Sequence, residues 1–276
     1  MSRPLPTPAC ESCPAHHTAN LLKLGVDMQD WDFVVALAGN PNTGKSTVFN
    51  ALTGLRQHTG NWPGKTVARA EGGFEYGGQR FKLVDLPGTY SLLSMTLDEE
   101  IARDFLLFGR PDVTVVVVDA TKLERNLNLA LQVLEITDRA VLCLNLIDEA
   151  RRHGLQVDHR RLARDLGVPV VPTAARNGKG MPNLLAAIAE VAAGRARGRV
   201  RSVRRLPSDL AQAVAQLATE VQAAFPGLPN ARWVALRLLD GDERIAQAVA
   251  RGELGELAGP QGVPEGIDGE LSPEAA

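Results

Sequence analysis

The stretch Gly39-Asn40-Pro41-Asn42-Thr43-Gly44-Lys45-Ser46 is a complete GxxxxGK[ST] motif. It follows a short apolar run at residues 33–38 and opens a segment with helical spacing at residues 45–53. In this context the glycines let backbone N–H groups turn inward, and the helix N-terminus adds its positive end. The sequence therefore predicts a phosphate-binding loop whose lysine reaches the β- and γ-phosphates and whose serine binds Mg²⁺. The loop residues predicted to contact the nucleotide are Gly39, Asn42, Thr43, Gly44, Lys45, Ser46 and Thr47.

Strands and helices alternate after this loop. Four further apolar runs have the length of strands, at residues 81–85, 113–119, 140–145 and 168–172, and helical patterns separate the later ones, at residues 99–108, 125–136 and 160–165. Strands that are apolar on both faces and alternate with helices predict an α/β fold with a mostly parallel sheet flanked by helices. Residues 72–80, with Gly77-Gly78 as a turn, predict a hairpin and one antiparallel edge strand.

The composition is that of a packed, water-soluble chain. It has 276 residues, 45% of them hydrophobic, and a net charge of −2. The 30 basic and 32 acidic residues give no global attraction to phosphate backbones, which excludes a nucleic-acid binder that works by bulk charge. No apolar run approaches the ~20 residues that span a bilayer. We expect the chain as given to be soluble and intracellular.

Changes in composition divide the chain into five parts. Residues 1–30 are Pro-rich and polar and are expected to be a flexible lead-in, whereas residues 31–195 carry the α/β pattern. Residues 196–206 are rich in arginine and predict a linker. Residues 207–258 show three stretches of helical spacing and predict a small all-helical domain. Residues 259–276, rich in Pro, Gly and acidic residues, are expected to be disordered.

A second nucleotide element, Asp85-Leu86-Pro87-Gly88, stands at the end of the predicted strand 81–85. The carboxylate of Asp85 can hold Mg²⁺ through water, and the amide of Gly88 can sense a γ-phosphate. Because Asp and Gly are both turn formers, a DxxG pattern alone is a weak signal. Its place at the end of a parallel strand, beyond the phosphate-binding loop, makes it a strong one.

Two further elements follow the next strands and predict the base that is bound. Asn145 and Asp148 are three residues apart after the run 140–145. A carboxylate there accepts hydrogen bonds from N1–H and N2–H₂ of guanine, and the asparagine holds O6/N7. Adenine lacks this donor pair, so the element predicts GTP rather than ATP. Thr173, Ala174 and Ala175 come after the last strand, where the backbone N–H of Ala175 would contact guanine O6.

The four elements in this order resemble those of Ras-like P-loop GTPases of the translation-factor type. Residues 60–67, GNWPGKTV, and residues 85–92, DLPGTYSL, are similar to signatures of the ferrous iron transport protein B family. The resemblance is close over residues 33–190, and residues 207–258 lie where that family carries its helical guanine-nucleotide dissociation inhibitor domain. It implies a GTP-hydrolysing regulatory unit of a ferrous iron transporter, with GTP/GDP, Mg²⁺ and K⁺ as ligands.

In that family the unit precedes a polytopic membrane region. The resemblance therefore implies a soluble fragment, from the cytoplasmic face of the inner or plasma membrane, of a chain that continues beyond Ala276. Its expected partners are the guanine nucleotide and the transmembrane permease region of the same polypeptide. A homo-oligomer is a further candidate partner, and nucleic acid is not expected as one.

The resemblance also assigns roles to single residues. Thr66 is the switch I threonine that meets Mg²⁺, alongside Ser46 and Asp85, and the γ-phosphate. Asn42 helps to hold a K⁺ ion that supplies the positive charge an arginine finger gives elsewhere, so Lys45, Thr66 and Asn42 form the catalytic set. Thr89 stands where Ras-like enzymes have a water-positioning Gln, which implies slow hydrolysis with water oriented by backbone groups.

The chain departs from the GTPase pattern at two positions. Ala174 replaces the usual Ser, which we expect to loosen the guanine-site loop and speed nucleotide release. Leu146 replaces the Lys that is common in Ras-like proteins, although the ferrous iron transport family tolerates a hydrophobic residue there.

The remaining features leave alternatives open. Cys10, Cys13 and His16 are a candidate site for Zn²⁺ or Fe²⁺, but with a single CxxC a disordered tail is the alternative. Cys143 lies in a predicted strand and is interpreted as core packing. Trp62 is either exposed on a switch I loop or packed onto the domain. For the whole chain, the alternatives are an Era-like RNA- or ribosome-associated GTPase and a non-catalytic GTP switch.

Overall fold

The computed structural model describes residues 14–54, 57–93, 96–196, 206–226, 228, 230–252 and 254. Residues 14–210 form one compact unit, and the described residues from 211 onward belong to another. Of the expected linker, residues 197–205 lie outside the described residues, as does the whole of the expected tail 259–276.

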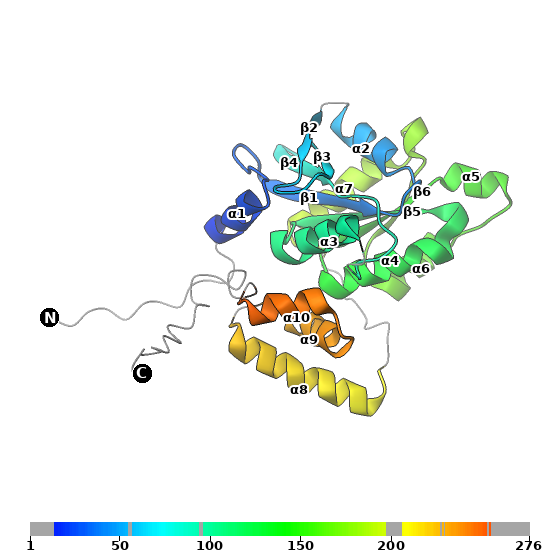
Figure 1. Ribbon diagram of the computed structural model, residues 1–276. Coiled ribbons are helices and arrows are strands. Elements are labelled where there is room, and N and C mark those ends of the chain that lie inside the picture. Colours follow the sequence, from blue (N-terminus) through cyan, green and yellow to red (C-terminus); the bar gives the residue numbers. More distant parts are fainter. Residues whose placement is uncertain are drawn as a thin grey trace, which may run out of the picture. The chain divides into compact units, whose positions relative to one another are not determined.

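A seven-stranded sheet forms the centre of the first unit, in the order β2-β3-β4-β1-β5-β6-β7 (Figure 1). Its strands are β1 (Phe33–Gly39), β2 (Gln57–Asn61), β3 (Ala68–Tyr76), β4 (Gln79–Asp85), β5 (Val113–Asp119), β6 (Ala140–Asn145) and β7 (Val170–Pro172). β4, β1, β5, β6 and β7 run parallel, whereas β3 is antiparallel to β4 and β2 is antiparallel to β3. The predicted mostly parallel sheet and the hairpin at residues 72–80 are confirmed. The strand β2 was not predicted; it adds a second antiparallel pairing and takes the edge position that was expected for β3.

Helices connect the strands as the alternating pattern predicts. They are α2 (Lys45–Thr53), α3 (Leu97–Asp104), α4 (Leu123–Ile136), α5 (Ile147–Arg152), α6 (His159–Leu166) and α7 (Met181–Ala192), with 3₁₀ turns η2 (Ala120–Lys122) and η3 (Ala175–Asn177). The helix predicted at residues 99–108 is α3 followed by one π-helical turn, η1 (Phe105–Gly109).

A core cluster of this unit lies between one face of the sheet and the helices α2 and α7. Alternate residues of β1 and β5, such as Val35 and Val115, pack with Phe49 of α2 and Leu184 of α7. All seven residues of β5 are buried, because helices cover both faces of a central parallel strand. Burial on both faces explains why these strands appear in the sequence as continuous apolar runs.

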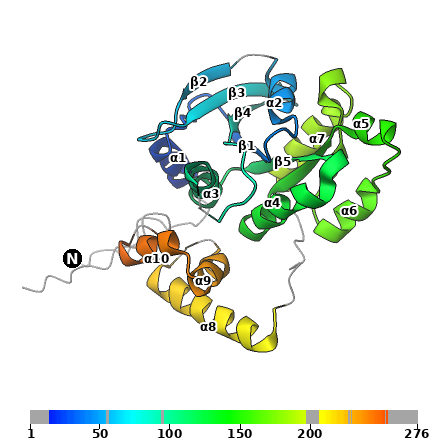
Figure 2. The same cartoon turned by 45° about the vertical axis from the view of Figure 1, so that its right-hand side comes forward.

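The helix α1 (Pro14–Lys23) corrects the expectation that residues 1–30 are a flexible lead-in, as far as residues 14–30 are concerned. Leu21 and Val26 are fully buried, and α1 contacts η1 beside α3 (Figure 2). The indole ring of Trp31 lies against Gly73, where a Cβ atom would be 2.0 Å from the ring. The partners of this segment, η1 and β3, are distant in sequence, so the local pattern of residues 14–30 does not indicate that the segment is packed.

The described part of the second unit contains most of α8 (Ser208–Ala224), together with α9 (Ala231–Leu239) and α10 (Glu243–Ala250), as the helical spacing predicts. Val221, Val234 and Ile245 are buried, one from each helix. Among the residues that the structure describes, none of the helices combines the length and the apolar character needed to cross a membrane.

Candidate nucleotide-binding site

The loop between β1 and α2 surrounds a pocket of about 290 Å³. Asn42 and Gly44 have positive φ angles of 65° and 80°, so the backbone can reverse between strand and helix. The first N–H groups of α2 have no acceptor within the helix and, with Lys45, favour an anion. The described residues that line the pocket are Asn40, Pro41, Asn42, Gly44, Lys45, Ser46 and Thr47.

Two glycines of the loop are required by close approaches of other elements. A Cβ atom on Gly39 would lie 2.7 Å from the carbonyl oxygen of Val117 in the neighbouring strand β5. A Cβ atom on Gly44 would lie 2.5 Å from Nδ2 of Asn145. The absence of side chains at these two glycines therefore lets strand β5 approach the loop on one side and Asn145, the predicted guanine-binding residue, approach it on the other.

The ammonium group of Lys45 forms an ion pair with Asp85 and donates a hydrogen bond of 2.7 Å to the carbonyl oxygen of Leu86. Burial raises the pKa of the Asp85 carboxyl group, and the neighbouring Lys45 opposes this rise. Gly88 lies close to Pro41, where a Cβ atom would be 3.5 Å from the proline ring. The predicted second element thus lies against the phosphate-binding loop.

The oxygen donors in this region suit a hard divalent cation. The Ser46 side chain is exposed at the pocket, and the Asp85 carboxylate is held beside the preceding residue, Lys45. Hydroxyl and carboxylate oxygens are ligands that Mg²⁺ accepts. Thr66, by contrast, is exposed and is not among the described residues that line the pocket.

Thr66 belongs to a tight turn that follows β2. The amide of Trp62 donates to the carbonyl oxygen of Val67 at 3.0 Å, and the amide of Lys65 donates to the carbonyl oxygen of Trp62 at 3.0 Å. Trp62 itself is 4% exposed. Of the two interpretations of Trp62, packing onto the domain is therefore confirmed, and the predicted switch I loop is in part the strand β2.

Asn145 connects three elements of the site. Its Nδ2 donates to the carbonyl oxygen of Thr43 at 3.0 Å, and its Oδ1 accepts from the backbone amide of Ala175 at 3.1 Å and from Oγ1 of Thr173 at 3.2 Å. Asn145 is 1% exposed, so these bonds are shielded from water. The phosphate-binding loop and the two predicted base-binding segments consequently form one bonded unit.

Asp148 is reachable at the surface, three residues after Asn145. Asn177 donates a hydrogen bond of 3.3 Å to its Oδ2, and Arg152 approaches the same oxygen at 3.7 Å. Ala174 is buried, and its backbone pairs with Lys179 in an isolated bridge. Both contacts of the carboxylate are to Oδ2, and the loop after β7 is held by its backbone.

Cys143 has a role that the sequence did not reveal. It is fully buried, which confirms core packing, but its Sγ also lies 3.2 Å from Oγ1 of Thr173 in a hydrogen bond. Burial raises the pKa of the thiol to about 12. The thiol thus contacts the threonine that bonds Asn145. Cys143 pairs with Val171 of β7, and Thr173 follows that strand directly, so only the pairing of β6 with β7 brings the two side chains together.

The second candidate metal site is not described in full. Cys10 and Cys13 lie outside the described residues, and His16 lies in α1 with a side chain that is not described. Among the residues whose side chains are described, no three His, Cys, Asp or Glu side chains gather as a metal-binding group.

Comparison with protein families gives two matches along the chain. Residues 33–188 match the family model of ferrous iron transport protein B, and residues 207–259 match that of the FeoB cytosolic helical domain. The Fe(2+) transporter FeoB of Escherichia coli strain K12 is 40% identical over 212 residues, which cover 75% of this chain and 27% of the transporter. The chain thus spans about a quarter of the length of the curated relatives it matches.

Solved structures show the same architecture. The cytosolic domain of T. maritima FeoB in a GDP form has a TM-score of 0.72 and 37% identity, over 81% of this chain and 85% of that chain. Its GMPPNP form has a TM-score of 0.69 and 35% identity, over 86% and 89% of the two chains. The cytosolic domain of L. pneumophila FeoB has a TM-score of 0.70 and 32% identity, over 81% and 95%.

Proposed function

Because the chain belongs to the ferrous iron transport protein B family, we propose that it is the GTP-binding, slowly GTP-hydrolysing regulatory part of a ferrous iron transporter. The G domain would comprise residues 31–195, and residues 207–258 would form the helical dissociation-inhibitor domain. Its partner would be the permease region of the same polypeptide, with this part on the cytoplasmic face of the membrane. The match of residues 207–259 to the FeoB helical domain argues against the Era-like alternative.

The bonded unit around Asn145 is the observation that carries this proposal. Its amide ties the phosphate-binding loop to the amide of Ala175, so a phosphate site and a base site are fixed at one spacing. Asp148 offers two acceptor oxygens to the N1–H and N2–H₂ donors of guanine. This combination favours a guanine nucleotide over an adenine nucleotide.

The catalytic roles follow from charge and geometry at the pocket. Lys45 would bind the β- and γ-phosphates, and Ser46 with Asp85 would hold Mg²⁺, which neutralises phosphate charge when it is bound. Asn42, at the surface of the pocket with φ at 65°, offers an amide oxygen for K⁺. Thr66 would join the site when switch I, residues 60–67, closes over the nucleotide.

Slow hydrolysis is supported by the residue that follows Gly88. Thr89 is 4% exposed, so its hydroxyl does not project toward bulk water as a water-positioning glutamine would. This burial also favours a second candidate function, a GTP switch without catalysis. Steady-state phosphate release in potassium and in sodium salts separates the two, because only the GTPase turns over and responds to potassium.

An exchange of base specificity tests the proposal. In Asp148→Asn, an amide donor faces the ligand in place of one carboxylate oxygen, so affinity for GTP should fall by about 1–3 kcal/mol while xanthosine triphosphate, with a carbonyl at C2, binds better. Asp165→Asn, at an exposed aspartate of α6, is the matched control and should leave both affinities unchanged. Titration of each nucleotide by calorimetry gives the answer, and equal loss of both would contradict guanine recognition by Asp148.

A further inference from the structure

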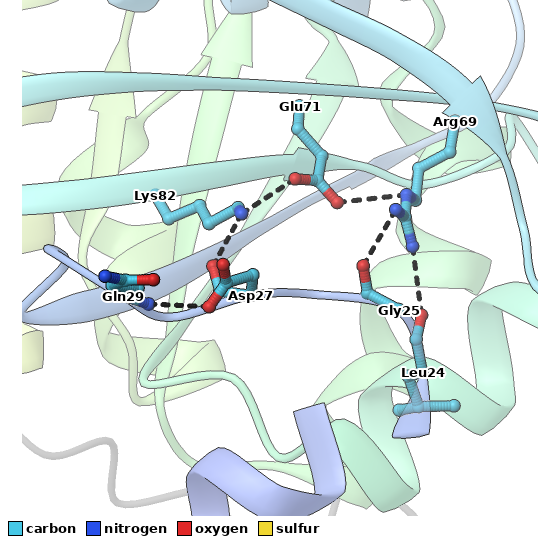
Figure 3. A network of polar contacts seen from close by, with 7 residues as sticks. All are labelled: Leu24, Gly25, Asp27, Gln29, Arg69, Glu71 and Lys82. Atoms are coloured by element: carbon cyan, nitrogen blue, oxygen red, sulfur yellow. Dashed lines mark hydrogen bonds and ion pairs between the residues drawn. The ribbon is translucent and has the colours of Figure 1, made fainter. Parts of the chain in front are cut away.

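The N-terminal arm, residues 14–31, is attached to the sheet next to switch I (Figure 3). Arg69 of β3 donates from Nη1 to the carbonyl oxygen of Leu24 at 3.0 Å and from Nη2 to that of Gly25 at 2.8 Å. Arg69 follows switch I by two residues. The same guanidinium therefore holds the end of α1 and fixes the point where switch I enters β3.

A partly buried carboxylate completes this attachment. Glu71 forms ion pairs with Nε of Arg69 at 3.0 Å and with Nζ of Lys82 at 2.8 Å, and Lys82 also donates a hydrogen bond to the carbonyl oxygen of Asp27 at 2.6 Å. The side chains of Glu71 and Arg69 are each only 14% exposed. Partly buried, paired and hydrogen-bonded charges of this kind cost much more to separate than exposed pairs do.

The arm also touches switch I directly. Gly25 has a φ of +80°, and a Cβ atom on it would lie 2.8 Å from Cγ of Pro63 and 2.5 Å from Nη1 of Arg69. The guanidinium of Arg69 lies 5.4 Å from the centre of the Trp62 ring, and Trp62 meets Phe105 of η1 edge-on at 5.4 Å. Arg69 and η1 together contact Trp62 of switch I, and Gly25 of the arm lies beside Pro63.

These contacts hold both ends of the turn that contains Thr66. Trp62 is packed at its start, Arg69 is bonded just after its end, and the bond from the Trp62 amide to Val67 closes it. The indole N–H of Trp62 is nevertheless buried without a hydrogen-bond partner among the described residues. An unsatisfied buried donor costs free energy, so this packed conformation of switch I is less stable than it would be with the indole N–H bonded.

We propose that Arg69 is a positioning residue through which the N-terminal arm holds switch I back from the nucleotide pocket. This inference rests on the proposed function, in which Thr66 must reach the γ-phosphate and Mg²⁺. Closing switch I then requires the arm contacts to loosen. The apparent affinity for a triphosphate is the affinity of the closed form multiplied by the fraction of molecules in which these contacts have loosened. A diphosphate lacks the γ-phosphate and is not subject to this reduction.

Substitution of Arg69 tests the coupling in the full chain. Arg69→Ala should bind GMPPNP about three- to tenfold more tightly, while its GDP affinity stays within about twofold of the unsubstituted protein. Arg69→Lys keeps the charge but lacks the planar fork that reaches Leu24, Gly25 and Glu71 together, so its GMPPNP affinity should fall between those of Arg69→Ala and the unsubstituted protein. Arg80→Ala, at an exposed arginine of β4, is the control and should leave the ratio of the two affinities unchanged.

A substitution in the arm tests the same contact from the other side. Gly25→Ala places a methyl group against Pro63 and Arg69, and should also tighten GMPPNP relative to GDP. Gly77→Ala is its matched control, because Gly77 has a similar φ of +60° but open space around its Cβ position. If Arg69→Ala fails to fold, as judged by circular dichroism, the Gly25 and Gly77 pair decides.

The outcomes separate this inference from the function on which it rests. An unchanged or weaker relative affinity for GMPPNP in both Arg69→Ala and Gly25→Ala would overturn the role of the arm. Failure of the unsubstituted chain to bind either guanine nucleotide would instead overturn the proposed function. Tighter GMPPNP binding in these variants, with both controls unchanged, supports the inference.

Discussion

Nδ2 of Asn145 donates a hydrogen bond of 3.0 Å to the carbonyl oxygen of Thr43, 102 residues earlier in the chain. The loop that would bind phosphates and the strand end that would bind the base are thus joined by one side chain. Because the bond is buried, its loss cannot be replaced by water at low cost.

Asn145→Ala should weaken nucleotide binding and destabilise the fold together. The amide of Ala175 and the carbonyl of Thr43 each lose a buried partner, so the free energy of unfolding should fall by about 1–3 kcal/mol. GDP affinity should fall at least about tenfold, since 1.4 kcal/mol corresponds to that factor. Urea denaturation and calorimetry measure both, with Asn128→Ala, at an exposed position of α4, as the control.

Gly44→Ala should abolish nucleotide binding, whereas Gly54→Ala should not. Both glycines have positive φ angles, 80° and 61°, so both substitutions impose backbone strain of about 1–2 kcal/mol. Only at position 44 does the new methyl group meet another side chain, Nδ2 of Asn145, at 2.5 Å. Equal GDP affinities in the two variants would show that the contact with Asn145 is unimportant.

Replacement of Asn42 should remove potassium stimulation of GTP turnover. Asn42 has φ at 65°, so Asn42→Gly keeps the backbone conformation without strain while it deletes the amide oxygen. Phosphate release in potassium should then match that in sodium, with GDP affinity within about twofold of the unsubstituted protein as a sign of an intact loop. Stimulation that persists in both Asn42→Ala and Asn42→Gly contradicts the assignment.

The thiol of Cys143 should make stability fall at alkaline pH. Burial raises its pKa from 9.0 to about 12, so above pH 9 the unfolded chain loses a proton that the folded chain keeps. The free energy of unfolding therefore decreases as the pH rises from 9 toward 12, by about 1 kcal/mol at pH 10. Denaturation curves measured between pH 7 and pH 10 should show this decrease in the free energy of unfolding for the unsubstituted protein. The same curves for Cys143→Ala should not show it.

The sequence was most informative where a short motif follows an apolar strand. The order of Lys45, Asp85 and Asn145 along the chain, each in a motif that follows an apolar run, was enough to predict that they serve one guanine-nucleotide site. The ion pair of Lys45 with Asp85 and the bond from Asn145 to the phosphate-binding loop follow from that arrangement. Local pattern and topology point the same way here.

Sequence patterns failed where the partner is a backbone group or a distant side chain. Arg69 donates to the backbone carbonyls of Leu24 and Gly25. Because every residue has a carbonyl, the side chains of residues 14–31 gave no sign of this attachment. Trp62 is buried by Phe105 and Arg69 rather than by its neighbours in the chain. β2, with five exposed and largely polar residues, has no alternation by which a strand could be recognised.

The strand β2 stands at one end of the sheet and covers the edge of β3, with Gln57 opposite Gly72 and Asn61 opposite Ala68. If switch I closes over a nucleotide and draws β2 with it, the backbone N–H and C=O groups of β3 on that side lose their partners. An uncovered strand edge is a template for pairing with another chain. The tendency of this protein to self-associate through its sheet would then change with the nucleotide it carries.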